Sequence, residues 1–74
     1  MSRLPTFTPR QVVAALLRAG FEELNQTGSH LHVRHPLSKR RTLVAIHARD
    51  LKRGTLIKII KQAGLTEEEF RQLL

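Results

Sequence analysis

The 74-residue sequence contains no cysteine, tryptophan or tyrosine, and it has only six acidic residues. Without cysteine, neither a disulfide nor a thiolate metal site can form, and a reducing compartment is the natural setting. The three phenylalanines are too few to build an aromatic platform for stacking single-stranded bases. No apolar run approaches the roughly 18 residues of a membrane span, and the first residues lack an export signal. These absences predict a cytoplasmic protein with no membrane partner.

Basic residues dominate the charge. Thirteen Lys and Arg against six Asp and Glu give a net charge of +7, and the sequence pI is near 11.5. Residues 34–61 contain nine of the basic residues and a single acid, Asp50. Such a region favours a polyanionic partner, most often a nucleic acid. A basic surface that serves only solubility is the alternative.

The length predicts a single domain over residues 1–74. A first helix is expected over residues 9–19, because Thr8 and Gln11 have the spacing of a capping box and Gly20 can end the helix. A second helix is expected to begin with Gly54 or Thr55 as its N-cap and to end at Gly64, and its apolar side consists of Leu56, Ile57, Ile59, Ile60 and Ala63. A short third helix follows a second capping box, formed by Thr66 and Glu69.

Three strands are expected between the first two helices. Residues 21–36 predict two strands around a Thr27–Gly28 turn, and residues 41–47 predict a third strand. Because side chains alternate along a strand, Leu31 and Val33 are predicted on the helix side of the second strand and His30, His32 and Arg34 on the other side. In the third strand, one face is predicted to carry Thr42, Val44 and Ile46 and the other face Leu43, Ala45 and His47.

The order of these elements predicts an α+β fold. A three-stranded antiparallel sheet would pack against the helices with one face and leave the other face open. The segment "GSHLHVRHP" (28–36) holds three of the four histidines, and two of them, His30 and His32, are predicted on the open face. Histidine is the side chain whose ordinary titration falls near neutral pH, so this cluster points to chemistry or to RNA binding.

These motifs, in this order, resemble the HicA (YcfA-like) family of bacterial toxins. The resemblance rests on "GSHLHVRHP", on the strand ending in His47 and on "LKRGTLIKIIKQAGL", and it extends from Leu4 to Leu65. It implies a double-stranded-RNA-binding-domain-like fold, mRNA interferase activity without a cofactor, and a HicB antitoxin that blocks the site. It also implies that His30 is the catalytic residue. Many members have a second histidine at the next position, where this chain has Leu31.

RNA carries its own nucleophile, the 2′-OH, so one histidine within reach can act as the general base. The pKa of an ordinary imidazole, about 6.5, leaves a neutral fraction at pH 7. Gly28 would let the backbone approach a phosphate, and Ser29 would orient that phosphate. His32 is the candidate acid, and His47 is expected near the site or at the edge of the sheet. Candidate RNA-binding cations are Arg34, Lys39, Arg40 and Arg41.

Two other functions compete with this one. His30 and His32, two positions apart on one strand face, have a spacing that zinc sites use, with His35 or His47 as the third ligand of a metal-dependent nuclease. The surrounding positive charge opposes a dication. The other alternative is a basic RNA-binding module without catalysis, which reads phosphates and shape.

Overall fold

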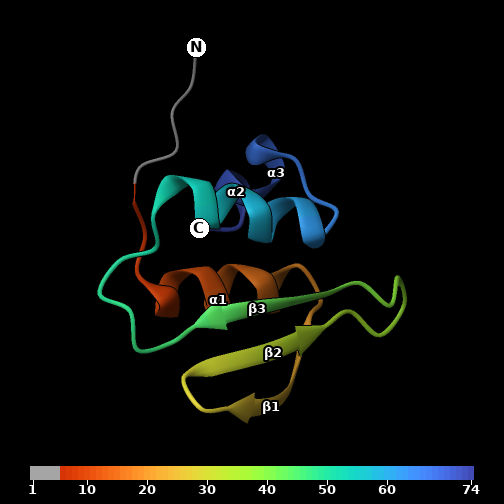
Figure 1. Ribbon diagram of the computed structural model, residues 1–74. Helices are drawn as coiled ribbons and strands as arrows, with labels where there is room; N and C mark the ends of the chain where they lie inside the picture. Colours follow the sequence, from red (N-terminus) through yellow and green to blue (C-terminus); the bar gives the residue numbers. More distant parts are fainter. Residues whose placement is uncertain (1–5) are drawn as a thin grey trace.

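Helices and strands follow one another in the predicted order. The computed structural model describes residues 6–74, which form three helices and a three-stranded antiparallel sheet. Figure 1 shows the helices beside the sheet. The helices are α1 (Pro9–Arg18), α2 (Arg53–Gln62) and α3 (Glu67–Gln72). The strands, in the spatial order β1-β2-β3, are β1 (Glu22–Thr27), β2 (His30–Arg34) and β3 (Arg41–Ala45). The α+β, double-stranded-RNA-binding-domain-like fold expected from the sequence is confirmed.

Both predicted capping boxes are present. At α1 the Thr8 hydroxyl accepts from the Gln11 backbone N–H at 3.2 Å, and the Gln11 side chain accepts from the Thr8 N–H at 2.9 Å. The helix ends one residue earlier than expected, with Ala19 as its C-cap. Thr66 and Glu69 form the equivalent pair at α3, at 3.0 and 2.8 Å. These local patterns are reliable because only neighbouring residues are needed to satisfy the free backbone N–H groups of a helix start.

The predicted N-cap of α2 was wrong. Lys52, and not Gly54 or Thr55, is the N-cap residue, and no side chain caps the helix. The reason lies in a tertiary contact, because the Leu51 N–H donates to the Phe7 carbonyl at 2.8 Å and Leu51 is buried. This contact fixes the chain just before Lys52, and the helix begins directly after it.

The hairpin turn lies one residue later than predicted. β1 continues through Thr27, and the two loop residues are Gly28 and Ser29, with Thr27 paired to His30. Gly28 has a φ of +60°, and Ser29 is not among the residues with positive φ. Glycine at the first of two loop positions is the pattern of a type II′ turn. Gly28 therefore provides the positive φ, and His30 becomes the first residue of β2.

The third strand is shorter than predicted. It ends at Ala45, because the Ala48 N–H closes a turn on the Ala45 carbonyl at 3.2 Å. His47 consequently lies beyond the strand, exposed in that turn.

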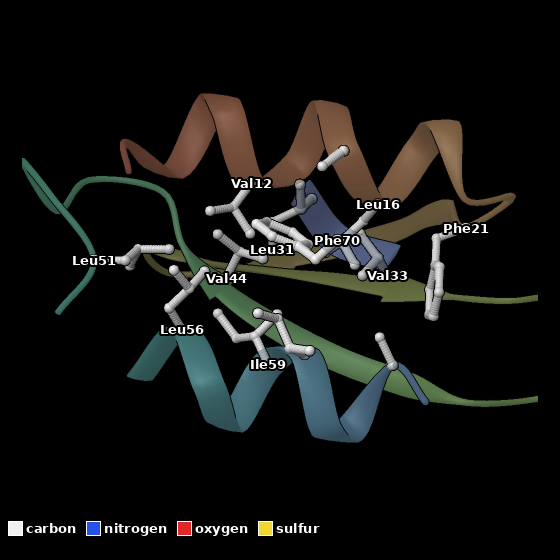
Figure 2. Packing of buried hydrophobic residues seen from close by; sticks show 13 residues of the cluster. Val12, Leu16, Phe21, Leu31, Val33, Val44, Leu51, Leu56, Ile59 and Phe70 are labelled. Carbon is white, nitrogen blue, oxygen red and sulfur yellow. The ribbon is translucent and has the colours of Figure 1, made fainter. Parts of the chain in front are cut away.

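The two faces of the sheet are as predicted. Figure 2 shows Leu31, Val33 and Val44 in the core, between α1 on one side and α2 on the other. The core consists of Val12, Ala15, Leu16, Phe21, Leu31, Val33, Val44, Leu51, Leu56, Ile59, Ile60, Ala63 and Phe70. α1 contacts β1 and β3, whereas α2 contacts β3. The side chains of His30 and its alternate neighbours lie on the opposite face.

Candidate functional site

His30 is held at a fixed point of the hairpin. The turn before it is anchored twice, because the Ser29 carbonyl accepts from the Ile46 N–H and the Gly28 carbonyl accepts from the Gln26 side chain, each at 2.9 Å. The His30 side chain itself is exposed. Because the hairpin is rigid, it fixes the position of the His30 side chain, as catalysis requires. Because the side chain is exposed, a large substrate can reach it.

A hollow of about 220 Å³ lies beside His30. It opens over β3, where Ala45 is the residue directly opposite His30. The small Ala45 side chain leaves space between His30 and α2. The lining residues are His30, Leu43 and Ala45 from the sheet and Thr55, Lys58, Ile59 and Gln62 from α2. Among the described residues that form this lining, Lys58 alone is a lysine or arginine, and none carries a carboxylate.

α2 therefore borders the open face of the sheet, which the sequence reasoning missed. The four α2 residues of the hollow follow the spacing i, i+3, i+4, i+7 and so form one stripe along the helix. Figure 2 shows Leu56, outside this stripe, directed at the core together with Ile59, which lies at the border between the core and the hollow. The apolar pattern of α2 predicts only the buried side of the helix. The adjoining stripe, which includes Lys58, is the sequence signal that could have indicated the contact of α2 with the open face.

His32 lies in a second hollow on the same face. This hollow measures about 440 Å³ and adjoins the first, because Leu43 and Gln62 line both. A β-bulge in β1 between Glu23 and Asn25 places Asn25 opposite His32, and Asn25 lines the second hollow. Successive residues on one strand face are about 7 Å apart along the strand. His30 and His32 can thus contact neighbouring groups of one extended ligand.

The side chain of His35 stabilises the β2–β3 loop. Its Nδ1 accepts from the backbone N–H groups of Leu37 and Ser38, at 3.1 and 3.3 Å, and so organises the β2–β3 loop. Its ring packs edge-to-face on Phe21, with centroids 5.2 Å apart. The backbone of Gly20 lies against the other ring nitrogen, where an added Cβ would come within 2.8 Å of Nε2. These contacts separate His35 from His30 and His32, which lie on the open face of the sheet.

The four candidate cations lie in different surroundings. Arg41 lines the hollow of His32. Lys39 is exposed in the loop, with a φ of +66°. Arg40 extends over the end of α2, where its guanidinium lies so close to Gly64 that an added Cβ would come within 2.5 Å of Nε. Arg34, half-buried, lies at the far end of β2 and pairs with Arg41 across the sheet.

The histidines of the sheet are not joined by other ligands in a metal-binding arrangement. Within residues 6–74, no three His, Asp or Glu side chains are grouped in a way that could hold a metal ion. His35 is directed into the loop and His47 lies beyond β3, so neither completes a site with His30 and His32. In the same range, none of the helices is both long and apolar enough to cross a membrane.

The chain is a small α+β domain whose open sheet face carries His30, His32 and Arg41. Comparison with protein families identifies the family to which it belongs. The model of the HicA toxin of bacterial toxin–antitoxin systems matches residues 9–65, from the start of α1 to just after α2. The chain belongs to this family and is thus the toxin component of a toxin–antitoxin system, which implies an antitoxin partner. A search of curated proteins finds no match.

Proposed function

We propose that this toxin is an endoribonuclease, an mRNA interferase, that cleaves mRNA in the cytoplasm with His30 as its general base. The observation that supports this most directly is the exposure of His30 beside a hollow that also contains a lysine and no carboxylate. A neutral imidazole can take a proton there, and an anionic phosphate meets no repulsion from the lining. Membership of the toxin family supports the same conclusion.

The proposed reaction uses the 2′-OH of the RNA as its nucleophile. His30 takes the proton of this hydroxyl as the 2′-oxygen bonds to the adjacent phosphorus. The bond between phosphorus and the 5′-oxygen breaks, and that oxygen leaves with a proton. The products are a 2′,3′-cyclic phosphate and a 5′-hydroxyl, so no water, metal or cofactor is consumed in the step. His32, one position along the same face, is the candidate donor of the second proton.

The surrounding polar groups suit an RNA strand that lies across the sheet. Asn25 and Arg41 line the hollow of His32, next to that of His30. Phosphates bound to cations position the strand, whereas amide groups can contact base edges. We assign positioning to Ser29, Lys39 and Arg41, and we assign to Gly28 the turn geometry that brings His30 to the start of β2.

The decisive experiment compares RNA with the same oligonucleotide carrying a single 2′-deoxy nucleotide at the mapped cleavage position. We expect cleavage of the RNA to products that end in a 2′,3′-cyclic phosphate, and no cleavage at the substituted position. Cleavage that persists at the deoxy nucleotide would exclude the 2′-OH as the nucleophile. If the purified protein binds RNA but leaves every substrate intact, the chain is a non-catalytic RNA-binding module and the proposal fails.

A HicB-type antitoxin is the proposed partner. An enzyme whose base lies on an exposed sheet face must be inhibited in the cell that makes it, and covering His30 is the direct way. The excess of positive charge would accelerate association with an acidic protein surface.

A further inference from the structure

We propose that Lys58 of α2 is a catalytic residue that binds the scissile phosphate next to His30. This inference rests on the proposed ribonuclease function and adds the group that stabilises the charge formed on the phosphate. In the transition state, negative charge increases on the oxygens that do not take part in bond making or breaking. A cation fixed beside them stabilises this charge more than it stabilises the ground state.

Lys58 lies in the lining of the hollow beside His30, and this position supports the proposed role. Lys58 and His30 line one hollow although they come from different elements, 28 residues apart in the sequence. The hollow is about 220 Å³, which suits a phosphate group with part of its ribose. Ala45, opposite His30, leaves the path between the two side chains open. A phosphate in this hollow would therefore contact the base on one side and the ammonium group on the other.

The other cations are less well placed for this task. Arg34 is the last residue of β2, four positions from His30, which corresponds to about 13 Å along a strand. Arg41 lines the hollow of His32 and not that of His30. Arg40 lies against Gly64 at the end of α2. Among the residues that the structure describes, Lys58 alone supplies a lysine or arginine side chain to the lining of the His30 hollow.

Thr42 and Gln62 keep α2 in position for this contact. The buried Thr42 hydroxyl in β3 donates to the Gln62 side-chain oxygen in α2 at 2.8 Å. Gln62 is also a lining residue, one turn after Lys58. The helix that carries the cation is thus hydrogen-bonded to the strand next to the one that carries the base.

The test compares Lys58→Ala with Lys61→Ala, which removes an equal charge from the same helix. Lys61 is exposed and does not line the hollow. Single-turnover cleavage is measured at saturating protein, and binding is measured separately with the uncleavable 2′-deoxy oligonucleotide. We expect Lys58→Ala to lower the cleavage rate by about 100-fold or more, in the range seen when one transition-state donor is removed. Lys61→Ala should change it less than about threefold, and Lys58→Arg should restore part of the rate.

Two outcomes would overturn the proposal. Equal, small effects of Lys58→Ala and Lys61→Ala on the rate would show that only the general charge of α2 matters. A loss of binding in Lys58→Ala with an unchanged saturated rate would make Lys58 a docking residue without a catalytic role. Both results require a wild-type protein that cleaves RNA, so they are distinct from failure of the ribonuclease function itself.

A second variant tests the hollow without removing a charge. Ala45→Leu adds bulk beside His30 in the lining of the hollow, at a half-buried position next to the core. We expect it to lower the cleavage rate at least tenfold, and the melting temperature shows whether the larger side chain is accommodated. Wild-type cleavage by a folded Ala45→Leu protein would contradict binding of the phosphate in this hollow.

Discussion

The hydroxyl of Thr42 in β3 donates a hydrogen bond to the side-chain oxygen of Gln62 in α2, at 2.8 Å. Thr42 is the only buried polar residue in the part of the chain that the structure describes. Its hydroxyl would be costly to bury without a partner. The bond joins α2 to the edge strand β3, and Gln62 lines both hollows on the open face.

Loss of this bond should reduce stability. Thr42→Val removes the hydroxyl at nearly constant volume, and we expect a loss of about 1 kcal/mol in the free energy of unfolding. For a domain of this size, that corresponds to a fall of about 4–8 °C in the melting temperature. The control is a double-mutant cycle with Gln62→Met, measured by denaturant unfolding. Strictly additive effects of the two substitutions would show that the bond contributes nothing.

The exposed histidines should differ sharply in their contribution to cleavage. His30→Ala is expected to abolish growth inhibition and to lower RNA cleavage by at least 100-fold, the scale of general base catalysis, with the fold unchanged. His47→Ala should leave the rate within about threefold, because His47 lies beyond β3 and outside both hollows. Circular dichroism checks folding for each variant. A His30→Ala protein that cleaves at the wild-type rate would exclude His30 as the base.

Cleavage should be independent of metal ions. The proposed step needs only a base, a proton donor and a cation from the protein, so EDTA is expected to leave the rate unchanged within twofold. The measurement is repeated after dialysis and after addition of zinc. Abolition by EDTA with recovery on addition of zinc would transfer the chemistry to a metal held by His30 and His32.

The fold could be predicted from the sequence to a large extent, because its signals are local. Capping boxes need only four residues, and the alternation of Leu31 and Val33 with histidines defines both faces of β2. The error at the start of α2 arose because a distant contact decides where the helix begins. Leu51 bonds to Phe7 and determines where α2 begins.

The site was less predictable than the fold for the same reason. His30 could be proposed from the sequence because its motif is contiguous. Lys58 could not, because its place beside His30 depends on how α2 docks against β3. The structural role of His35 likewise depends on Phe21 and on the loop backbone. Helix docking and loop closure are set by packing between residues distant in sequence, which periodicity does not report.

The basic residues Lys39, Arg40 and Arg41, at the end of the β2–β3 loop and the start of β3, should have two different functions. Lys39 and Arg41 are exposed, and we expect their joint replacement by alanine to weaken RNA binding irrespective of sequence. The slope of log K against log salt should become shallower by up to about 1.4 for two lost single-strand phosphate contacts. Arg40→Ala should instead lower stability by about 0.3–1 kcal/mol, because its cation lies at the C-terminal end of α2. An unchanged salt slope in the double variant would mean that RNA enters by another route.

The antitoxin should cover the hollows that contain the histidines. We expect a stable complex in which hydrogen exchange slows at residues 28–35 and in α2 around Lys58, and in which RNA competes with the antitoxin. Charge reversal at Lys58 to glutamate should slow association, since the encounter with an acidic surface is electrostatically assisted. The chain offers a second, apolar surface on the helix side of the sheet, lined by Val13, Leu17 and Ile46 among others. Protection confined to that surface, with no competition by RNA, would mean that the antitoxin inhibits the toxin without covering His30.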